Sequence, residues 1–334
     1  MIIDGAYFGA LRRRIKRSAW LRYSPWLRLN WPNHPKNESK NPSVAVVSVN
    51  YNTALYISYL LFSLCRIIGR HNLGEIVIVD NGSTDGSKEI LRGLHKAGLI
   101  TLIANEKQQY HGPGLNQGMS YLADKARKNP RQQNSPDYVL VLDSDIIILR
   151  PTILDDLLIG MKKWGGGLAG EIENFDHVEG GYAHVSSILI DPTQVWRRGI
   201  TPFEEHGVPA MILQRDLVRK QILRYHFPLR SAFYVLHLWN GTLRAIRDSA
   251  FVQNKYYGYA STLKNNNAED FPQGRYLLEE FRTIFNSEVP ALTPLAVVNA
   301  CLQQRQIVLQ RPFELLKQFK PVTVWNGDGC IVED

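Results

Sequence analysis

Tyr138-Val-Leu-Val-Leu-Asp-Ser-Asp-Ile-Ile-Ile-Leu-Arg-Pro151 is the stretch that decides the fold of this chain. Its apolar, β-branched first part, Tyr138 to Leu142, is typical of a strand that is buried on both faces. Asp143 and Asp145 follow this strand, one residue apart. Two carboxylates in one turn repel each other and lose solvation, so they need a divalent cation, hydrogen-bond donors or water. The stretch therefore predicts either a site for Mg²⁺ or Mn²⁺ shared with substrate phosphates, or a solvated turn.

Strands and helices alternate on the N-terminal side of this stretch. Three earlier runs have strand character, and helical patterns follow each of them. Such alternation is the signature of an α/β fold with a Rossmann-like, mostly parallel sheet and helices on both faces. The expected strands are 44–50, 75–80, 100–104 and 138–142, and the expected helices are 54–68, 88–97 and a segment that ends near 128, after a glycine-rich turn at 111–118.

Polar residues gather where these four strands end, at 48–52, 80–87, 105–118 and 143–145. Ligands of such sheets bind beyond the carboxyl ends of the strands, so the four segments are expected to meet at one edge. Each of them could also be an ordinary turn, because Asp, Asn, Ser and Gly favour turns. No Gly-x-Gly-x-x-Gly follows the first strand and no Walker Gly-Lys-Ser/Thr occurs, which argues against dinucleotide and P-loop sites.

Four motifs resemble one known family: Ser48-Val-Asn-Tyr-Asn52, Ile78-Val-Asp-Asn-Gly-Ser-Thr-Asp-Gly-Ser87, Gly114-Leu-Asn-Gln-Gly118 and Leu142-Asp-Ser-Asp145. Together, and in this order, they are similar to the nucleotide-sugar-binding half of family 2 glycosyltransferases with the GT-A fold. The resemblance is close over 44–149 and looser to 242. It implies inverting transfer of a sugar from a nucleoside-diphosphate donor to an acceptor hydroxyl, assisted by Mn²⁺ or Mg²⁺.

The resemblance also assigns roles to single residues. It implies that Asp80 accepts a hydrogen bond from the nucleobase, that Asp143 lies near the ribose and the metal, and that Asp145 is a direct metal ligand. His237 resembles a histidine that completes the metal site in related families, although it could instead be a core or surface histidine. The residues expected to bind the nucleotide sugar are Asn50, Tyr51, Asn52, Asp80, Asn81, Gly82, Asn116, Asp143 and Ser144, and the expected metal ligands are Asp143, Asp145 and His237.

The catalytic base is where the chain departs from the family pattern. An inverting transferase needs a carboxylate that takes the proton of the acceptor hydroxyl. The family usually supplies it as an acidic pair that opens a helix, followed by Asp-Leu and Arg. Here the pattern is disturbed. Glu205 is the first choice for the base, with Glu204, His206 and Asp216 behind it; all could also belong to an ordinary loop or helix start.

The N-terminal 43 residues carry +7 of the net charge of +8, together with Trp20, Trp26 and Trp31. Cations mixed with amphipathic aromatic residues suit an anionic lipid surface. A solvated tail or a nucleic-acid contact would be the alternatives, and nucleic acid is the less expected partner. Without a signal-peptide core or an apolar run of about 18 residues, we expect a cytoplasmic protein, peripheral on the inner face of the cytoplasmic membrane.

The expected organisation is a basic aromatic leader at 1–43, a GT-A domain at 44–245 and a helical region at 246–334. Within the GT-A domain, 44–149 would bind the nucleotide sugar and 150–245 the acceptor, a glycan or lipid-linked glycan of a bacterial surface polysaccharide or glycolipid. The motifs look most like rhamnosyltransferases, which favours a deoxythymidine-linked rhamnose donor over uridine-linked glucose or galactose. A nucleotidyltransferase and a non-catalytic nucleotide-sugar-binding protein are the alternatives from other classes.

Overall fold

The computed structural model describes most of the chain from the first expected strand onward. No helix within these described residues combines the length and the apolar character that a membrane crossing needs. The described residues are 31, 42–68, 73–128, 135–175, 177–196, 200, 202–204, 209–238, 272–307, 313–318, 324–326 and 329–331.

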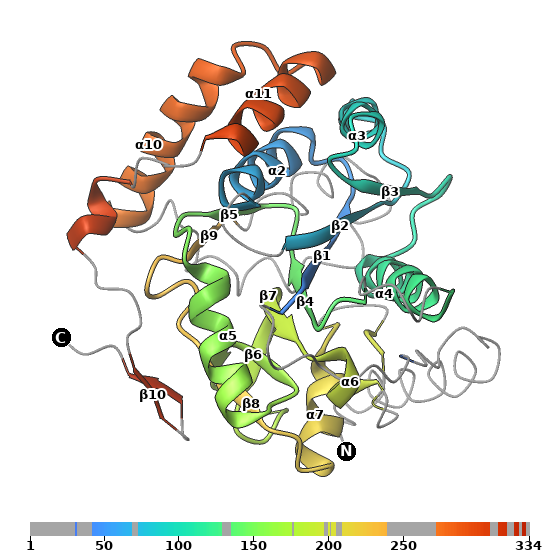
Figure 1. Cartoon of the computed structure of the whole chain (residues 1–334), viewed down its shortest axis with the longest axis vertical. Coiled ribbons are helices and arrows are strands. Elements are labelled where there is room, and N and C mark those ends of the chain that lie inside the picture. The colour runs from blue at the N-terminus through green and yellow to red at the C-terminus, as the bar shows by residue number, and fades with distance from the viewer. Residues whose placement is uncertain are drawn as a thin grey trace, which may run out of the picture.

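A mixed β-sheet forms the centre of the molecule (Figure 1). Within the described residues its strands run in the order β3-β2-β1-β4-β7-β6-β8. The first four pair in parallel, as the alternation of strands and helices predicts. The strands of this sheet are β1 (Val44–Asn50), β2 (Leu73–Asp80), β3 (Thr101–Ala104), β4 (Tyr138–Leu142), β6 (Leu168–Glu173), β7 (Tyr182–Ile190) and β8 (Arg224–His226).

Strand β7 reverses the direction of the sheet. It is antiparallel to β4 on one side and to β6 on the other, and β8 is parallel to β6. The start of β7 and the ends of β4, β6 and β8 therefore lie at the same edge as the ends of β1 to β3. The predicted α/β fold with a mostly parallel sheet is confirmed, and its second half adds residues from antiparallel strands to the ligand-binding edge.

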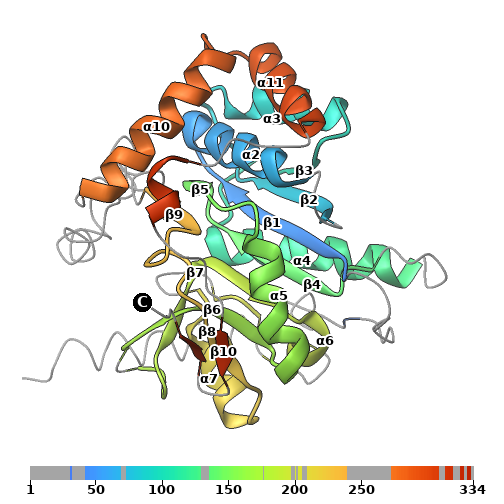
Figure 2. The ribbon, with the colours of Figure 1, turned by 60° about the vertical axis from the view of Figure 1, so that its left-hand side comes forward.

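Side chains of the buried strands alternate between two hydrophobic cores. On β1, Val44 and Val46 face one core, whereas Ala45, Val47 and Val49 face the other. The helices accordingly form layers on both faces of the sheet, with α10 and α11 outside α2 and α3 (Figure 2). The first core receives α2 (Ala54–Ile68), α3 (Ser87–Lys96), α5 (Ile153–Trp164), α10 (Pro272–Glu288) and α11 (Pro294–Gln306), and the second receives α4 (His111–Lys128), α6 (Pro192–Val195) and α7 (Met211–Arg219).

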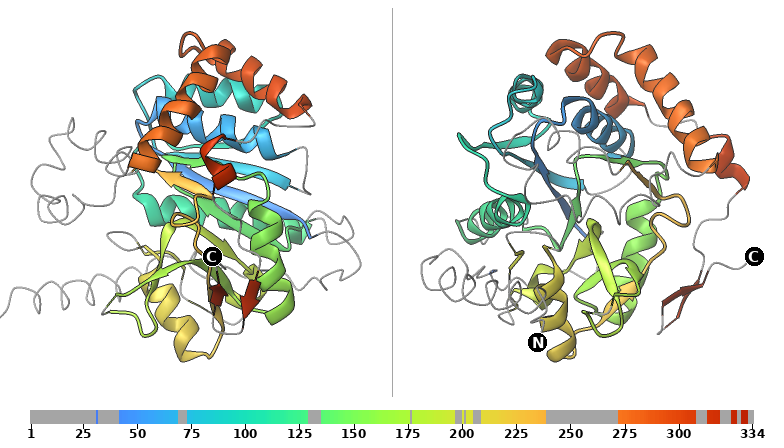
Figure 3. Two further views of the ribbon diagram at one scale, coloured as in Figure 1. Left: turned by 90° about the vertical axis from the view of Figure 1, so that its left-hand side faces the viewer. Right: turned by 180° about the vertical axis from the view of Figure 1, so that it is seen from behind.

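The C-terminal region packs on α2 through aromatic rings. Phe281 of α10 is fully buried, and its ring centroid lies 5.2 Å from Tyr59 and 6.0 Å from Phe62. The view from behind shows α2 between the sheet and this helical pair (Figure 3). The region expected to be helical, 246–334, contains α10, α11 and the 3₁₀ helix η3 (Leu315–Gln318) among its described residues. An unpredicted hairpin, β10 (Val324–Asn326) with β11 (Gly329–Ile331), follows them.

Two sequence expectations change in the structure. Helix α4 begins at His111, so the segment interpreted as a glycine-rich turn is already helical. Its glycines are positions of close packing rather than of a turn: at Gly112 an added Cβ would lie 1.6 Å from the carbonyl oxygen of Glu204. Trp31 is buried and its ring packs 6.0 Å from that of Trp196, so this tryptophan of the leader is a core residue.

Candidate active site

Two short strands bring the candidate metal ligands together. The strand β5 (Ile146–Ile148) directly follows Asp145, and it pairs antiparallel with β9 (Val235–His237). In this register His237 lies opposite Ile146, and the backbone N–H of Leu238 donates to the carbonyl oxygen of Asp145 at 3.0 Å. The pairing therefore carries a histidine from 92 positions later in the chain to the Asp-Ser-Asp turn.

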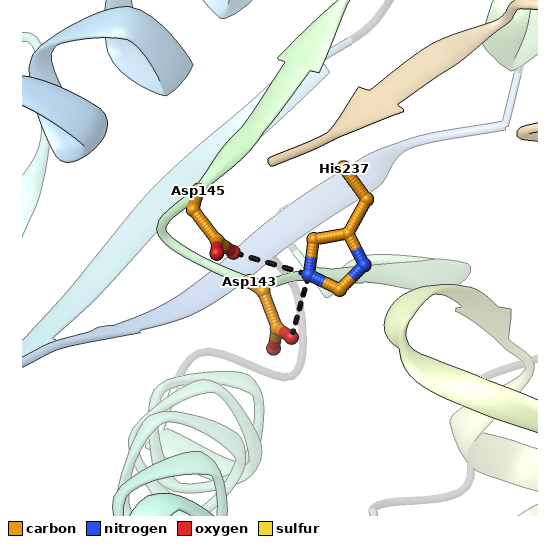
Figure 4. Close-up of side chains that lie close together, drawn as sticks. All are labelled: Asp143, Asp145 and His237. Atoms are coloured by element: carbon orange, nitrogen blue, oxygen red, sulfur yellow. Dashed lines mark ion pairs between the residues drawn. The ribbon is translucent and has the colours of Figure 1, made fainter. Parts of the chain in front are cut away.

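Asp143, Asp145 and His237 each offer a ligand atom, and these atoms lie within 4.8 Å of one another (Figure 4). Nε2 of His237 is 3.2 Å from Oδ1 of Asp145 and 3.7 Å from Oδ2 of Asp143. Adjacent ligands of an octahedral cation with bonds of about 2.1 Å are roughly 3.0 Å apart, so the spacing of His237 and Asp145 matches that of neighbouring ligands, and Asp143 would have to move closer to His237. Two carboxylates and one imidazole suit Mn²⁺ or Mg²⁺, the cofactors expected from the sequence.

Histidines surround the carboxylate of Asp143. Oδ1 of Asp143 lies 3.2 Å from Nε2 of His111, on the side opposite His237. Burial by itself would raise the pKa of the Asp143 carboxyl, but the imidazoles of His111 and His237 outweigh burial and hold that pKa well below its usual range. Asp143 is therefore ionised, as a metal ligand must be.

His184 adds a third ring to this surround from β7. Its ring centroid lies 5.9 Å from that of His237, and its Nδ1 accepts a hydrogen bond from the backbone N–H of Ser186 at 3.2 Å. Burial lowers the pKa of His184 to about 3, although the Asp143 carboxylate acts in the opposite direction. The ring is therefore neutral at neutral pH, with its proton on Nε2.

A polar network joins the loops after β1 and β2 to the Asp-Ser-Asp turn. The fully buried Asn50 donates from Nδ2 to Asp80 Oδ1 at 2.8 Å, and its Oδ1 accepts from the hydroxyl of Thr53 at 2.6 Å. The oxygen of the same Thr53 hydroxyl accepts from the hydroxyl of Ser144 at 3.1 Å, because its one proton is directed at Asn50. Asp80 is also fully buried, and its second oxygen accepts from the backbone N–H of Ser83 at 3.2 Å. Three strand ends are thus held as one rigid unit beside the candidate metal ligands.

The family model for glycosyl transferase family 2 matches residues 44–251 of this chain. The chain belongs to glycosyl transferase family 2. It is a glycosyltransferase enzyme, and the mixed sheet with its Asp-Ser-Asp turn after β4 is the GT-A fold of that family. A search of curated proteins gives no match.

Three solved structures are among those to which this glycosyltransferase is similar. The mannosyltransferase PcManGT from Pyrobaculum calidifontis, in complex with GDP-Man and Mn²⁺, is 17% identical with a TM-score of 0.45 over 90% of this chain and 96% of its own. Glucosyl-3-phosphoglycerate synthase from Mycobacterium tuberculosis, with Mn²⁺, UDP and glucosyl-3-phosphoglycerate, is 15% identical with a TM-score of 0.39 over 58% and 76%. S. aureus TarS 1–349 with UDP is 15% identical with a TM-score of 0.40 over 79% and 89%.

Several residues expected to bind the nucleotide sugar make contacts within the transferase itself. The side chain of Asn116 donates to the carbonyl oxygen of Phe203 at 2.9 Å and accepts from its N–H at 3.0 Å. Asn81 is buried, and its Nδ2 donates to the carbonyl oxygen of Tyr110 at 3.2 Å. Both side chains thus support the start of α4. Tyr51, Asn52 and Gly82 lie in the two loops of the polar network.

The candidate bases divide between described and undescribed residues. Glu205 and His206 lie outside the described residues. The backbone of Glu204 lies against Gly112, and its carboxylate accepts from the N–H of Ile212 at 2.8 Å, at the start of α7. Asp216 lies further along α7, where it pairs with Arg219 at 3.6 Å. The transferase therefore brings the segment 202–204, rather than Asp216, against the helix that begins with His111.

Sequence reasoning missed His111 and His184. The sequence predicts only a glycine-rich turn at 111–118, and it gives His184 no role. One signal in the sequence was available: His184 alternates with buried apolar residues at the N-terminal end of β7, which an antiparallel pairing with β4 brings to the ligand-binding edge. The start of β7 lies next to Asp143 only because β7 runs antiparallel to β4, and local sequence does not encode that direction.

Proposed function

We propose that this protein is a metal-dependent, inverting glycosyltransferase that moves one sugar at a time from a nucleoside-diphosphate sugar to an acceptor hydroxyl. The observation that carries the proposal is the convergence of Asp143, Asp145 and His237 beside a rigid polar edge of the sheet. A metal group adjacent to loops that can surround a nucleotide fits the diphosphate of such a donor.

The donor would lie across the ends of β1, β2 and β4. Asn50, Asp80 and Ser144 belong to one hydrogen-bonded network, so a nucleoside held there would have a fixed position relative to the metal ligands. A nucleobase that bonds to Asp80 would replace the 3.2 Å contact from Ser83, the longer of its two bonds. A preformed pocket of this kind reduces the ordering cost of donor binding.

Asp143, Asp145 and His237 would hold the cation, which when bound would neutralise charge on the departing nucleoside diphosphate. One oxygen of Asp143 faces His111 and the other faces His237, so Asp143 would offer a single oxygen to the cation. Because all three ligands follow or sit on paired strands, their positions do not depend on the donor.

The base would come from the acidic pair at 204–205. The acceptor oxygen would attack the anomeric carbon while its proton passes to the carboxylate, and the bond from that carbon to the diphosphate oxygen would break with inversion. We propose Glu205 for this role, with Glu204 next, because the backbone of Glu204 lies against the first turn of α4 beside His111. The bond of Glu204 to the N–H of Ile212 gives that carboxylate a capping role instead.

A thermal-shift experiment tests the donor and metal together. Uridine, deoxythymidine and guanosine diphosphates should raise the melting temperature with Mn²⁺ present and much less with a chelator, because only ligands that bind the native state stabilise it. The base with the largest shift identifies the donor nucleotide, and deoxythymidine is expected. Asp145→Asn should remove the metal-dependent part of the shift. No shift with any nucleotide in Mn²⁺ would contradict the proposed function.

Substitution of the acidic pair tests the base. Glu205→Gln should leave the nucleotide-induced shift unchanged but lower kcat by at least about 100-fold, because a base acts only in the chemical step. Glu204→Gln and Asp216→Asn are the matched controls, with smaller effects expected on turnover. If Glu205→Gln keeps wild-type kcat while one control loses it, the base is the residue changed in that control.

The acceptor is proposed to be a lipid-linked glycan of a bacterial surface polysaccharide, reached from a membrane surface. Each basic side chain near an anionic leaflet contributes about 1 kcal/mol, so half of the nine in residues 1–43 would hold the protein reversibly. Because Trp31 is buried against Trp196, the aromatic contribution would come from Trp20 and Trp26. The full chain should sediment with anionic liposomes, whereas a chain that begins at Asn41 should stay in the supernatant. Equal sedimented fractions for the two would refute attachment through the leader.

A further inference from the structure

The carboxylate of Asp143 has a different neighbour on each side. Its Oδ2 faces Nε2 of His237 at 3.7 Å, within the candidate metal group, whereas its Oδ1 faces Nε2 of His111 at 3.2 Å. His111 is not within the group of ligand atoms that surrounds the candidate metal position in the described structure. The two oxygens of one carboxylate therefore point toward two different elements, β9 on one side and α4 on the other.

The position of His111 is fixed by the start of α4. The carbonyl oxygen of Tyr110 accepts from the N–H of Gly114 at 3.1 Å and from the side chain of Asn81 at 3.2 Å. One and a half turns later Asn116 makes two hydrogen bonds to the backbone of Phe203. A ring attached to a helix start that is anchored on both sides has little freedom to follow a carboxylate that rotates.

The backbone of Asp143 is fixed as well. Its N–H donates to the carbonyl oxygen of Ser186 on β7 at 2.8 Å, and its own carbonyl oxygen accepts from the N–H of Ile146 at 3.2 Å. Only the side-chain torsions of Asp143 remain, and these decide whether an oxygen faces His237. Nε2 of His111 lies 3.2 Å from Oδ1, and as a donor to that oxygen it would select the rotation that presents Oδ2 to the metal position.

We propose that His111 is a positioning residue for the metal: its Nε2–H holds Oδ1 of Asp143 and thereby orients Oδ2 as a ligand. This inference rests on the proposed metal-dependent function. It assigns His111 no contact with the sugar, the diphosphate or the acceptor. The structural requirement is a hydrogen-bond donor at the Nε2 position, not a ring, which separates this role from simple packing.

Mn²⁺ titration of the full chain without nucleotide tests the role, with calorimetry as the readout. His111→Ala should raise the Kd for Mn²⁺ by about 10- to 100-fold, the usual effect of removing an outer-shell partner of a metal ligand. His111→Gln, whose side-chain N–H₂ reaches a similar position, should restore the Kd to within about threefold of wild type. His95→Ala is the matched control: the ring of His95, on α3, contacts the backbone carbonyl oxygen of Ile100 at 3.0 Å and does not belong to the candidate metal group, so the Kd should not change.

His111→Phe keeps the bulk of the ring without a donor and serves where the alanine variant does not fold. A Kd for Mn²⁺ that is unchanged in both donor-free variants would overturn the inference. So would a His111→Gln variant that binds Mn²⁺ as weakly as the phenylalanine variant, since the role would then belong to the shape of the ring. If neither wild type nor Asp145→Asn binds Mn²⁺, the proposed metal-dependent function fails, and the inference fails with it. If wild type binds Mn²⁺, the His111 variants test the positioning role alone.

Discussion

Gly112→Ala is expected to push the segment at 202–204, on the candidate acceptor side of the site, away from helix α4. The added methyl group would lie 1.6 Å from the carbonyl oxygen and 2.6 Å from the carbonyl carbon of Glu204. Both atoms are backbone, so no side-chain rotation relieves the clash. Helix α4 and the segment at 202–204 must move apart until the contact reaches at least 3.0 Å, which requires a displacement of about 1.4 Å.

The displacement breaks specific contacts. The two bonds between Asn116 and the backbone of Phe203 are 2.9 and 3.0 Å long, and neither survives a separation of that size. Overpacking costs about 1–3 kcal/mol and each of the two lost hydrogen bonds about 0.5–1.5 kcal/mol, so the free energy of unfolding should fall by roughly 2–6 kcal/mol. A misplacement of about 1 Å between a base and a donor also lowers turnover, by about 100-fold.

Urea unfolding gives the stability, and release of nucleoside diphosphate from the preferred donor gives kcat. Gly118→Ala is the matched control, because it adds the same methyl group to the same helix but crowds the side chain of Val47 on β1, 2.6 Å away. We expect the control to lose stability by about 1–3 kcal/mol while the folded protein keeps its turnover.

Two results would refute the reasoning about Gly112. Wild-type stability together with wild-type kcat in Gly112→Ala would mean that α4 and the segment at 202–204 do not touch in solution. A loss of kcat that is equal in Gly112→Ala and Gly118→Ala would mean that turnover follows general packing of α4 rather than the contact with Glu204.

Three further substitutions test other parts of the structure. Phe281→Ala should lower the free energy of unfolding by about 3–5 kcal/mol in urea, because the ring is fully buried among Tyr59 and Phe62, whereas the half-exposed Tyr276→Ala on the same helix should change it by less than about 0.5 kcal/mol; equal effects would contradict the packing of α10. Thr53→Val removes the bonds to Asn50 and Ser144 and should cost about 1–3 kcal/mol and reduce the nucleotide-induced melting shift; an unchanged shift would show that the loops are held without it. Burial would raise the pKa of Glu75, but hydrogen bonds from Lys125, Thr101 and Tyr121 outweigh it and lower that pKa. The stabilisation by Glu75 is therefore present above its unfolded-state pKa and is lost as the pH falls through its folded-state pKa. Between about pH 5 and pH 3 the melting temperature of wild type should drop more than that of Glu75→Gln, and parallel plots of melting temperature against pH would refute this.

The parallel half of the fold could be predicted because its signals are local. Each of the strands β1, β2 and β4 is a short apolar run that ends in polar residues, and the rule that ligands bind at carboxyl ends of parallel strands then places Asp80 and Asp143 at one edge. The direction of β7 and β6 could not be predicted in this way. An antiparallel strand that is buried on both faces has the same apolar pattern as a parallel one, so residues 182–190 carry no sign of their direction.

Glycine was the misleading signal at the start of α4. Gly112 and Gly114 flank a proline, a combination that usually marks a turn, yet both are helical here. The fold uses the small size of these glycines rather than their flexibility, because the absence of a side chain at Gly112 lets the backbone of Glu204 come close. That partner lies 92 positions away in the chain, and no window of local sequence contains it. Asn116, which the sequence predicts to bind the nucleotide sugar, has a similarly distant partner: it bonds to the backbone of Phe203, 87 positions away.

The candidate site combines one element that short-range sequence determines with two that long-range pairing determines. Asp143 and Asp145 are placed by the strand that precedes them, whereas His237 reaches them through β9 and His111 through the packing of α4 on the segment at 202–204. A metal ion bound between Asp143, Asp145 and His237 would therefore join β4, β5 and β9, and a donor on Asp143 would extend the connection to α4. Since the candidate acidic pair follows Phe203, the position of the acceptor side is coupled to the metal side through α4 itself. Changes at the start of α4 should consequently affect metal affinity and turnover together, which changes in the polar network at Asn50 should not.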